Sequence, residues 1–146
     1  MYKKKKEEII MGITLRNKHM SFDLGSGGFY NLRKNIAGLL SKEFQELYIN
    51  WTSGKMTNDE GNKQLLSLYN RKILKDKDDT ILNFLFASDI DGKLTVKDSR
   101  LLYDLVKDYN DNILYGYAGR PDCFRFKDFK ILLKDSVDHK LVITWD

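Results

Sequence analysis

Alternating apolar and polar side chains near both ends of the chain predict a small β-sheet. Residues 12–17 and residues 19–24 each alternate with a period of two, which is typical of strands that bury one face. Asn17 and Lys18 lie between them and favour a tight turn, so the two segments are predicted to form a hairpin. Residues 141–145 are rich in β-branched and aromatic side chains and predict a third strand.

Between the hairpin and the last strand, apolar residues recur at spacings of three and four, which predicts amphipathic helices. In the first of these helices Arg33 falls on the polar face, so we expect it to be solvent-exposed. Two pairs, Thr57 with Glu60 and Thr95 with Asp98, have the spacing of capping boxes and mark the starts of helices. The predicted helices cover residues 29–51, 57–73, 81–86 and 96–109 and a final segment that carries Phe126, Phe129, Leu132 and Leu133.

These elements predict an α+β fold, in which a small antiparallel sheet of the N-terminal hairpin and the C-terminal strand packs with four to five helices. The chain has 146 residues, of which 42% are hydrophobic, and this is enough to bury one core. We therefore expect residues 11–146 to form a single domain. No stretch approaches the roughly eighteen apolar residues that a membrane-spanning helix needs, so we expect a cytoplasmic protein without a membrane partner.

Residues 1–10 are rich in lysine and glutamate, and we expect them to form a disordered basic leader. The run of lysines is not followed by the apolar segment of a targeting signal. Read as codons, Lys6, Glu7 and Glu8 match a purine-rich ribosome-binding site, and Met11 follows at the spacing that initiation requires. We therefore expect Met11 to be the native start of the protein.

Residues 87–98 contain alternating carboxylates and a glycine. With Gly92 at the sixth position of a calcium loop, Asp89, Asp91 and Asp98 take positions three, five and twelve, so the segment resembles one EF-hand loop. The first position is alanine, however, and the twelfth carries aspartate where glutamate is usual. The alternative is a turn that leads into a capped helix, and the sequence favours this structural interpretation over a cation site.

A glycine-rich segment joins the second strand to the first helix. Residues 22–29 resemble the first motif of Rossmann-like methyltransferases, but the third glycine is displaced and the next parallel strand is missing, which argues against that activity. Backbone amides at the start of a helix attract anions, so a small anion or nucleotide is an alternative to a plain glycine turn. The residues of such a site are Gly25, Ser26, Gly27, Gly28, Arg33 and Arg120.

The remaining polar residues give no catalytic or zinc motif. Cys123 is the single cysteine and has no cysteine or histidine partner at metal-ligand spacing. His19 and His139 lie far apart in the sequence, each beside a lysine, and we interpret both as ordinary surface residues. Basic residues alternate with 21 acidic ones and form no one-sided helix face, which disfavours nucleic-acid binding. We expect no enzymatic activity and no cofactor.

The composition, with 19 Lys against 6 Arg, is typical of an A+T-rich genome. Three segments add to this observation: Met11-Gly12-Ile13, Gly27-Gly28-Phe29-Tyr30-Asn31-Leu32-Arg33-Lys34 and Ser88-Asp89-Ile90-Asp91-Gly92. In its composition and in these segments the chain resembles uncharacterised small proteins of phages and prophages of low-GC Firmicutes, a resemblance that implies no established activity.

From the sequence we predict a non-enzymatic interaction module that binds and modulates a host protein. Tyr109, Tyr115, Tyr117 and Arg120 are the predicted interface residues, because tyrosine and arginine are favoured at interface centres. Burial of these tyrosines in the core is an equal alternative. Two other classes remain open: a protein that binds or sequesters a small anionic ligand at the glycine-rich segment, and a divalent-metal-responsive domain that uses the acidic loop.

Overall fold

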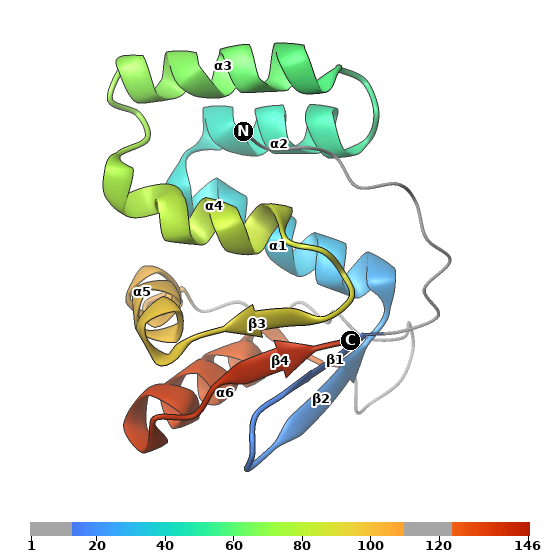
Figure 1. Cartoon of the computed structure of the whole chain (residues 1–146), viewed down its shortest axis with the longest axis vertical. Coiled ribbons are helices and arrows are strands. Elements are labelled where there is room, and N and C mark those ends of the chain that lie inside the picture. The colour runs from blue at the N-terminus through green and yellow to red at the C-terminus, as the bar shows by residue number, and fades with distance from the viewer. Residues whose placement is uncertain (1–12, 110–123) are drawn as a thin grey trace. The chain divides into compact units, whose positions relative to one another are not determined.

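The described part of the chain, residues 13–109 and 124–146 of a computed structural model, has the predicted α+β fold (Figure 1). It contains six α-helices, a short 3-10 helix and a four-stranded antiparallel sheet. In chain order the elements are β1 (Ile13–Arg16), β2 (Ser21–Leu24), α1 (Ser26–Leu40), α2 (Lys42–Thr52), α3 (Asn58–Asn70), η1 (Asp76–Asp78), α4 (Asp79–Phe86), β3 (Gly92–Leu94), α5 (Val96–Val106), α6 (Phe126–His139) and β4 (Ile143–Trp145).

Residues 33–86 form one compact unit, and the other described residues, 13–32, 87–109 and 124–146, belong to a second. Helix α1 runs from the second unit into the first. The expectation of a single domain over residues 11–146 stays a prediction. The predicted leader and the start at Met11 lie outside the described residues.

The second unit contains the sheet, whose strands have the order β2-β1-β4-β3. The hairpin forms as predicted, with Ile13 opposite Leu24 and Arg16 opposite Ser21. The expected pairing of the last strand with the hairpin is confirmed, because β4 lies antiparallel to β1. The inward side chains of β1 are at most 1% exposed, and Figure 1 shows α6 lying across one face of the sheet.

The fourth strand of the sheet, β3, was not predicted, since the sequence indicated only a turn around Gly92. In the structure, β3 pairs with β4 and places Gly92 opposite Trp145. A β-carbon at Gly92 would lie 1.7 Å from an atom of the Trp145 indole. Glycine is therefore required for the close packing of this ring on the neighbouring strand, a contact that short-range sequence patterns do not reveal.

The prediction of a single helix over residues 29–51 is wrong, because the helix is divided at Ser41. Ser41 has extended backbone angles, and its side chain accepts a hydrogen bond from the backbone N–H of Phe44, which caps α2. The apolar periodicity continues across this break, so it gave no sign of two helices. The prediction that Arg33 is solvent-exposed is also wrong. Its side chain is 5% exposed and its guanidinium lies 5.3 Å from the centre of the Phe84 ring.

Helices α2 and α3 of the first unit pack closely through Trp51 and Gly61. A β-carbon at Gly61 would lie 2.3 Å from the Trp51 indole, and the indole N–H donates to the side-chain oxygen of Asn58 at 2.9 Å. Thr57 caps α3 by accepting a hydrogen bond from the backbone N–H of Glu60, which is one half of the capping box that the spacing predicted. None of the helices in the described ranges has the length and apolarity needed to cross a bilayer.

Candidate metal centre

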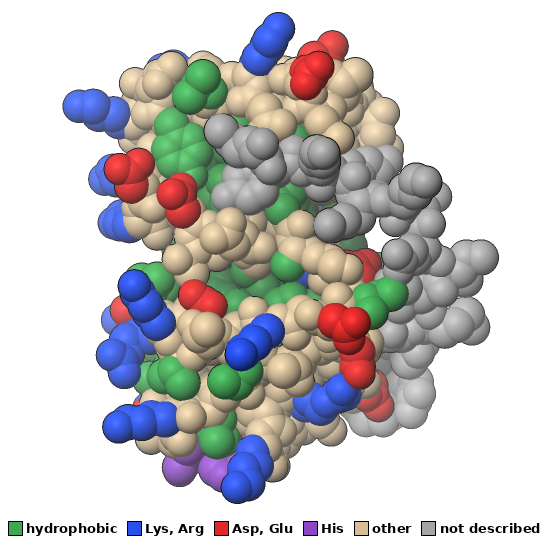
Figure 2. Space-filling view, viewed as in Figure 1, with side chains coloured by type: hydrophobic (Ala, Val, Ile, Leu, Met, Phe, Trp, Pro, Cys, Tyr) green, Lys and Arg blue, Asp and Glu red, His purple; other side chains and the backbone are tan. Residues whose placement is uncertain are grey.

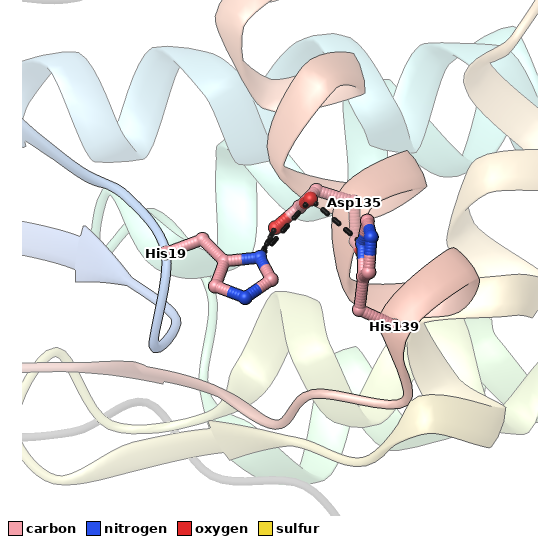
Figure 3. A group of neighbouring side chains, drawn as sticks. All are labelled: His19, Asp135 and His139. Atoms are coloured by element: carbon pink, nitrogen blue, oxygen red, sulfur yellow. Dashed lines mark hydrogen bonds and ion pairs between the residues drawn. The ribbon is translucent and has the colours of Figure 1, made fainter.

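Two histidines and an aspartate meet at the surface of the second unit (Figure 3). His19 lies in the turn between β1 and β2, and Asp135 and His139 lie near the end of α6. One ligand atom from each residue is within 4.8 Å of the other two. In the described part of the chain, no other group of three or more histidines, cysteines or carboxylates comes together in this way.

The Asp135 carboxylate stands between the two imidazoles. His19 Nδ1 lies 3.0 Å from Asp135 Oδ2, and His139 Nδ1 lies 2.9 Å from Asp135 Oδ1. His139 Nδ1 also lies 3.1 Å from the backbone oxygen of Asp135. The rings contact each other edge to face, with their centres 4.9 Å apart. Each histidine thus directs its own Nδ1 atom toward the Asp135 carboxylate.

The fold brings these residues together through the pairing of the first and last strands. Arg16, the last residue of β1, lies opposite Thr144 of β4. Helix α6 ends at His139, and Lys140 adopts the left-handed conformation that turns the chain toward β4. The end of α6 therefore returns to the side of the hairpin where His19 is located.

Asn17 holds the hairpin turn and the carboxylate in one network. Its side-chain oxygen accepts hydrogen bonds from the backbone N–H groups of His19 and Met20, at 2.8 and 2.9 Å. Its side-chain N–H₂ group donates to Asp135 Oδ2 and to Ser136 Oγ, both at 2.9 Å. Asn17 thereby orients one histidine and the aspartate, in the way that residues around metal ligands commonly orient them.

The carboxylate is kept in its ionised form by this environment. Burial acts to raise the pKa of Asp135, but the hydrogen bonds from Asn17 and His19 and the charges of the two histidines outweigh it, so the pKa lies below its ordinary value.

The Asp135 side chain is 15% exposed, whereas those of His19 and His139 are 43% and 56% exposed. The histidines form one visible surface patch in Figure 2.

This set of donors suits a divalent transition-metal ion. Imidazole nitrogen and carboxylate oxygen are ligands of Zn²⁺ and of related ions, and catalytic zinc sites commonly use three protein ligands. A tetrahedral ion with bonds of about 2.0–2.1 Å holds its ligand atoms about 3.3 Å apart. The contacts of 3.0 and 2.9 Å between each imidazole and the carboxylate are close to that spacing. The ligand atoms of the two histidines lie within 4.8 Å of each other, so binding of one ion would require them to move closer together.

The acidic loop has a structural role that involves some of its predicted metal ligands. Asp98 Oδ2 accepts from the backbone N–H of Thr95, and Thr95 Oγ1 accepts from that of Asp98, which confirms the predicted capping box of α5. The Trp145 indole N–H donates to the backbone oxygen of Ser88 at 2.9 Å and so fixes the start of the loop. Asp89, Asp91 and Asp98 do not assemble into a metal-ligand group.

The glycine-rich segment forms the start of α1, which begins at Ser26, three residues before the predicted position. Gly25 and Gly27 have open space where a β-carbon would stand, and the side chain of Arg33 is buried in the first unit. Arg120 lies outside the described residues. Anion binding at Gly25, Ser26, Gly27 and Gly28 therefore stays a prediction.

The predicted interface patch is described only at Tyr109, whose ring packs edge to face on that of Phe126 with a centroid distance of 4.9 Å. Tyr115, Tyr117 and Arg120 lie outside the described residues, as does Cys123. The prediction that these residues form an exposed interface patch stays a prediction.

A separate groove of about 250 Å³ lies on the first unit between α2 and α3. Glu43 and Arg71 line it and pair with each other, with Arg71 donating two hydrogen bonds to the Glu43 carboxylate at 2.6 and 3.3 Å. The hydrogen bond from Arg71 lowers the pKa of Glu43 below its ordinary value, and this effect exceeds the opposing effect of burial. Both side chains are about half exposed, so the pair contributes little to stability.

Comparison of the chain with protein-family models, with curated proteins and with solved structures finds no match. The resemblance to small phage proteins accordingly stays a prediction, and the function has to be argued from the geometry alone. Sequence reasoning missed the cluster of His19, Asp135 and His139. One local signal was present: Asp135 and His139 are four residues apart on a predicted helix, a spacing that places two side chains on one face.

Proposed function

We propose that this protein is a binding module for a divalent transition-metal ion, with Zn²⁺ as the ion that best fits its donors. His19, Asp135 and His139 are the proposed ligands. The observation that carries the proposal is the position of one carboxylate between two imidazole Nδ1 atoms, at 2.9 and 3.0 Å. This combination of two histidines and one carboxylate is a common transition-metal ligand set.

Two further features support metal binding. Asn17 holds the Asp135 carboxylate and the turn that carries His19, which reduces the reorganisation needed when an ion enters. Asp135 is deprotonated near neutral pH as an ordinary aspartate is, and its pKa lies below the ordinary value, so its oxygens are available to an ion. Metal binding then requires only that the imidazole nitrogens give up any protons they carry.

The exposure of the cluster favours binding over catalysis. Both histidine side chains are about half exposed, so a bound ion would be in contact with bulk water. Catalytic metal sites gain much of their effect from the exclusion of water. A bound ion would also link the hairpin turn to the end of α6 and thereby stabilise the second unit. This role is compatible with the predicted interaction module.

Isothermal titration of the tag-free, metal-stripped full chain with Zn²⁺ tests the proposal. We expect one ion per chain, and we expect His139→Gln or Asp135→Asn to weaken binding more than about 100-fold, since loss of a direct ligand exceeds the 10–100-fold typical of residues that support ligands. Asp138→Asn is the matched control, because this exposed carboxylate lies on the same helix and pairs with Lys134 at 3.0 Å.

The control variant should bind Zn²⁺ with the affinity of the parent protein. Equal affinities of the parent, His139→Gln and Asp135→Asn proteins would overturn the proposal, and so would the absence of Zn²⁺ binding to the parent. Circular dichroism of each variant without metal identifies any loss of folding. If His139→Gln is unfolded, His19→Gln serves as the second ligand variant, because it changes the turn rather than the helix.

A further inference from the structure

The proposed metal centre has three protein ligands, and a tetrahedral ion needs four. In the described ranges no fourth histidine, cysteine or carboxylate joins His19, Asp135 and His139. Asn17 cannot supply its oxygen without losing the hydrogen bonds that this atom accepts from the backbone of His19 and Met20. The fourth position therefore belongs to a ligand from outside these residues.

The charge of the loaded centre selects the kind of ligand. A divalent ion bound by two neutral imidazoles and one carboxylate keeps a net charge of about +1. Lys18 directly precedes His19 in the sequence, and Lys140 directly follows His139. Both lysines are exposed. The nearby carboxylate of Asp138 is paired with the ammonium group of Lys134. Two exposed lysines are thus sequence neighbours of the proposed ligands and add positive charge to the residual charge of the ion.

We infer that the metal-loaded centre binds an external oxyanion as its fourth ligand. This inference rests on the proposed function, and it adds the chemical class of the ligand. Anionic oxygen is an acceptable ligand of Zn²⁺, and its charge neutralises the residual positive charge of the ion. Because the histidines lie at the surface, the position is accessible to a carboxylate or a phosphate group, which are two sources of the same chemistry.

Visible spectroscopy of the full chain loaded with Co²⁺ in place of Zn²⁺ tests this inference. Acetate and methyl phosphate are the two anionic probes, and acetamide is the neutral counterpart of acetate. We expect at least one anion to change the cobalt bands in a saturable way, and we expect acetamide to leave them unchanged at the same concentrations. The anion that binds at lower concentration identifies the source as carboxylate or phosphate.

A double variant, Lys18→Gln with Lys140→Gln, tests the contribution of the surrounding charge. Unit charges about 10 Å away in water each change the binding of an ion roughly twofold, so we expect anion affinity to fall about fourfold. The affinity for Co²⁺ itself should not fall, because neither lysine is a ligand. An unchanged anion affinity in this variant would contradict the charge argument.

The outcomes separate this inference from the proposed function. If Co²⁺ binds and its spectrum is unaffected by both anions, the inference fails and metal binding stands. If acetamide acts as well as acetate, or if the anions only remove cobalt from the protein, the inference also fails. If the parent protein does not bind Co²⁺ or Zn²⁺, both proposals fail.

Discussion

Replacement of Gly92 by alanine should destabilise the second unit through its effect on Trp145. The added β-carbon would lie 1.7–2.2 Å from three atoms of the indole, so the ring has to move. The ring is 1% exposed, and its N–H donates to Ser88. Overpacking of this kind costs about 1–3 kcal/mol and loss of the hydrogen bond about 1 kcal/mol, which gives an expected loss of about 2–4 kcal/mol.

Urea denaturation followed by far-ultraviolet circular dichroism measures this loss. Asp91→Asn is the matched control, because it removes a loop charge and keeps a residue that tolerates the positive φ of 57° at this position. We expect the control to stay within about 0.5 kcal/mol of the parent protein, and we expect Ca²⁺ to leave both midpoints unchanged. A Gly92→Ala protein as stable as the parent would refute the reasoning. A calcium-dependent gain in stability that Asp91→Asn abolishes would support the hypothesis of a cation site in this loop.

Three further perturbations test other parts of the structure. Gly61→Ala places a β-carbon against the Trp51 indole and should lower the free energy of unfolding by about 1–3 kcal/mol, measured by urea denaturation. Thr95→Ala removes the cap of α5 and should cost about 1 kcal/mol in the same assay; no loss would contradict the capping role. Arg71→Gln should lower stability slightly at neutral pH. Because the folded-state pKa of Glu43 is depressed, its contribution is present above the unfolded pKa and is lost as pH falls through the folded pKa. The difference between variant and parent should therefore vanish in acid, and a difference that persists there would exclude this ion pair as its cause.

The local pattern of the chain predicts most of its elements. The alternation in β1 and β2, the apolar spacing in α4 and α6 and the cap at Thr95 all correspond to observed structure. These features depend on residues that lie close together in the sequence, and their physical causes act over the same short range. For that reason the amino-acid sequence alone predicts the α+β class. The pairing of the last strand with the hairpin was predicted on a different ground, namely that an isolated hairpin is only marginally stable.

The features that escaped prediction depend on contacts between distant residues. Strand β3 exists because it pairs with β4 beside a buried indole, and a segment of three residues has too little pattern to reveal this. Arg33 is buried although its helical position is polar, because it packs on Phe84. His19 joins Asp135 and His139 only through the pairing of the first and last strands. The local sequence pattern therefore indicated only the pair on the helix, Asp135 and His139.

Anomalous X-ray diffraction at the zinc absorption edge tests the central claim most directly. Crystals of the full chain grown with one equivalent of Zn²⁺ should contain an anomalous peak about 2.0–2.1 Å from Nδ1 of His19 and of His139 and about 2.0–2.2 Å from the Asp135 carboxylate. A peak at other residues, or zinc-containing crystals in which the two imidazoles still contact Asp135 with no peak between them, would contradict the proposed metal centre.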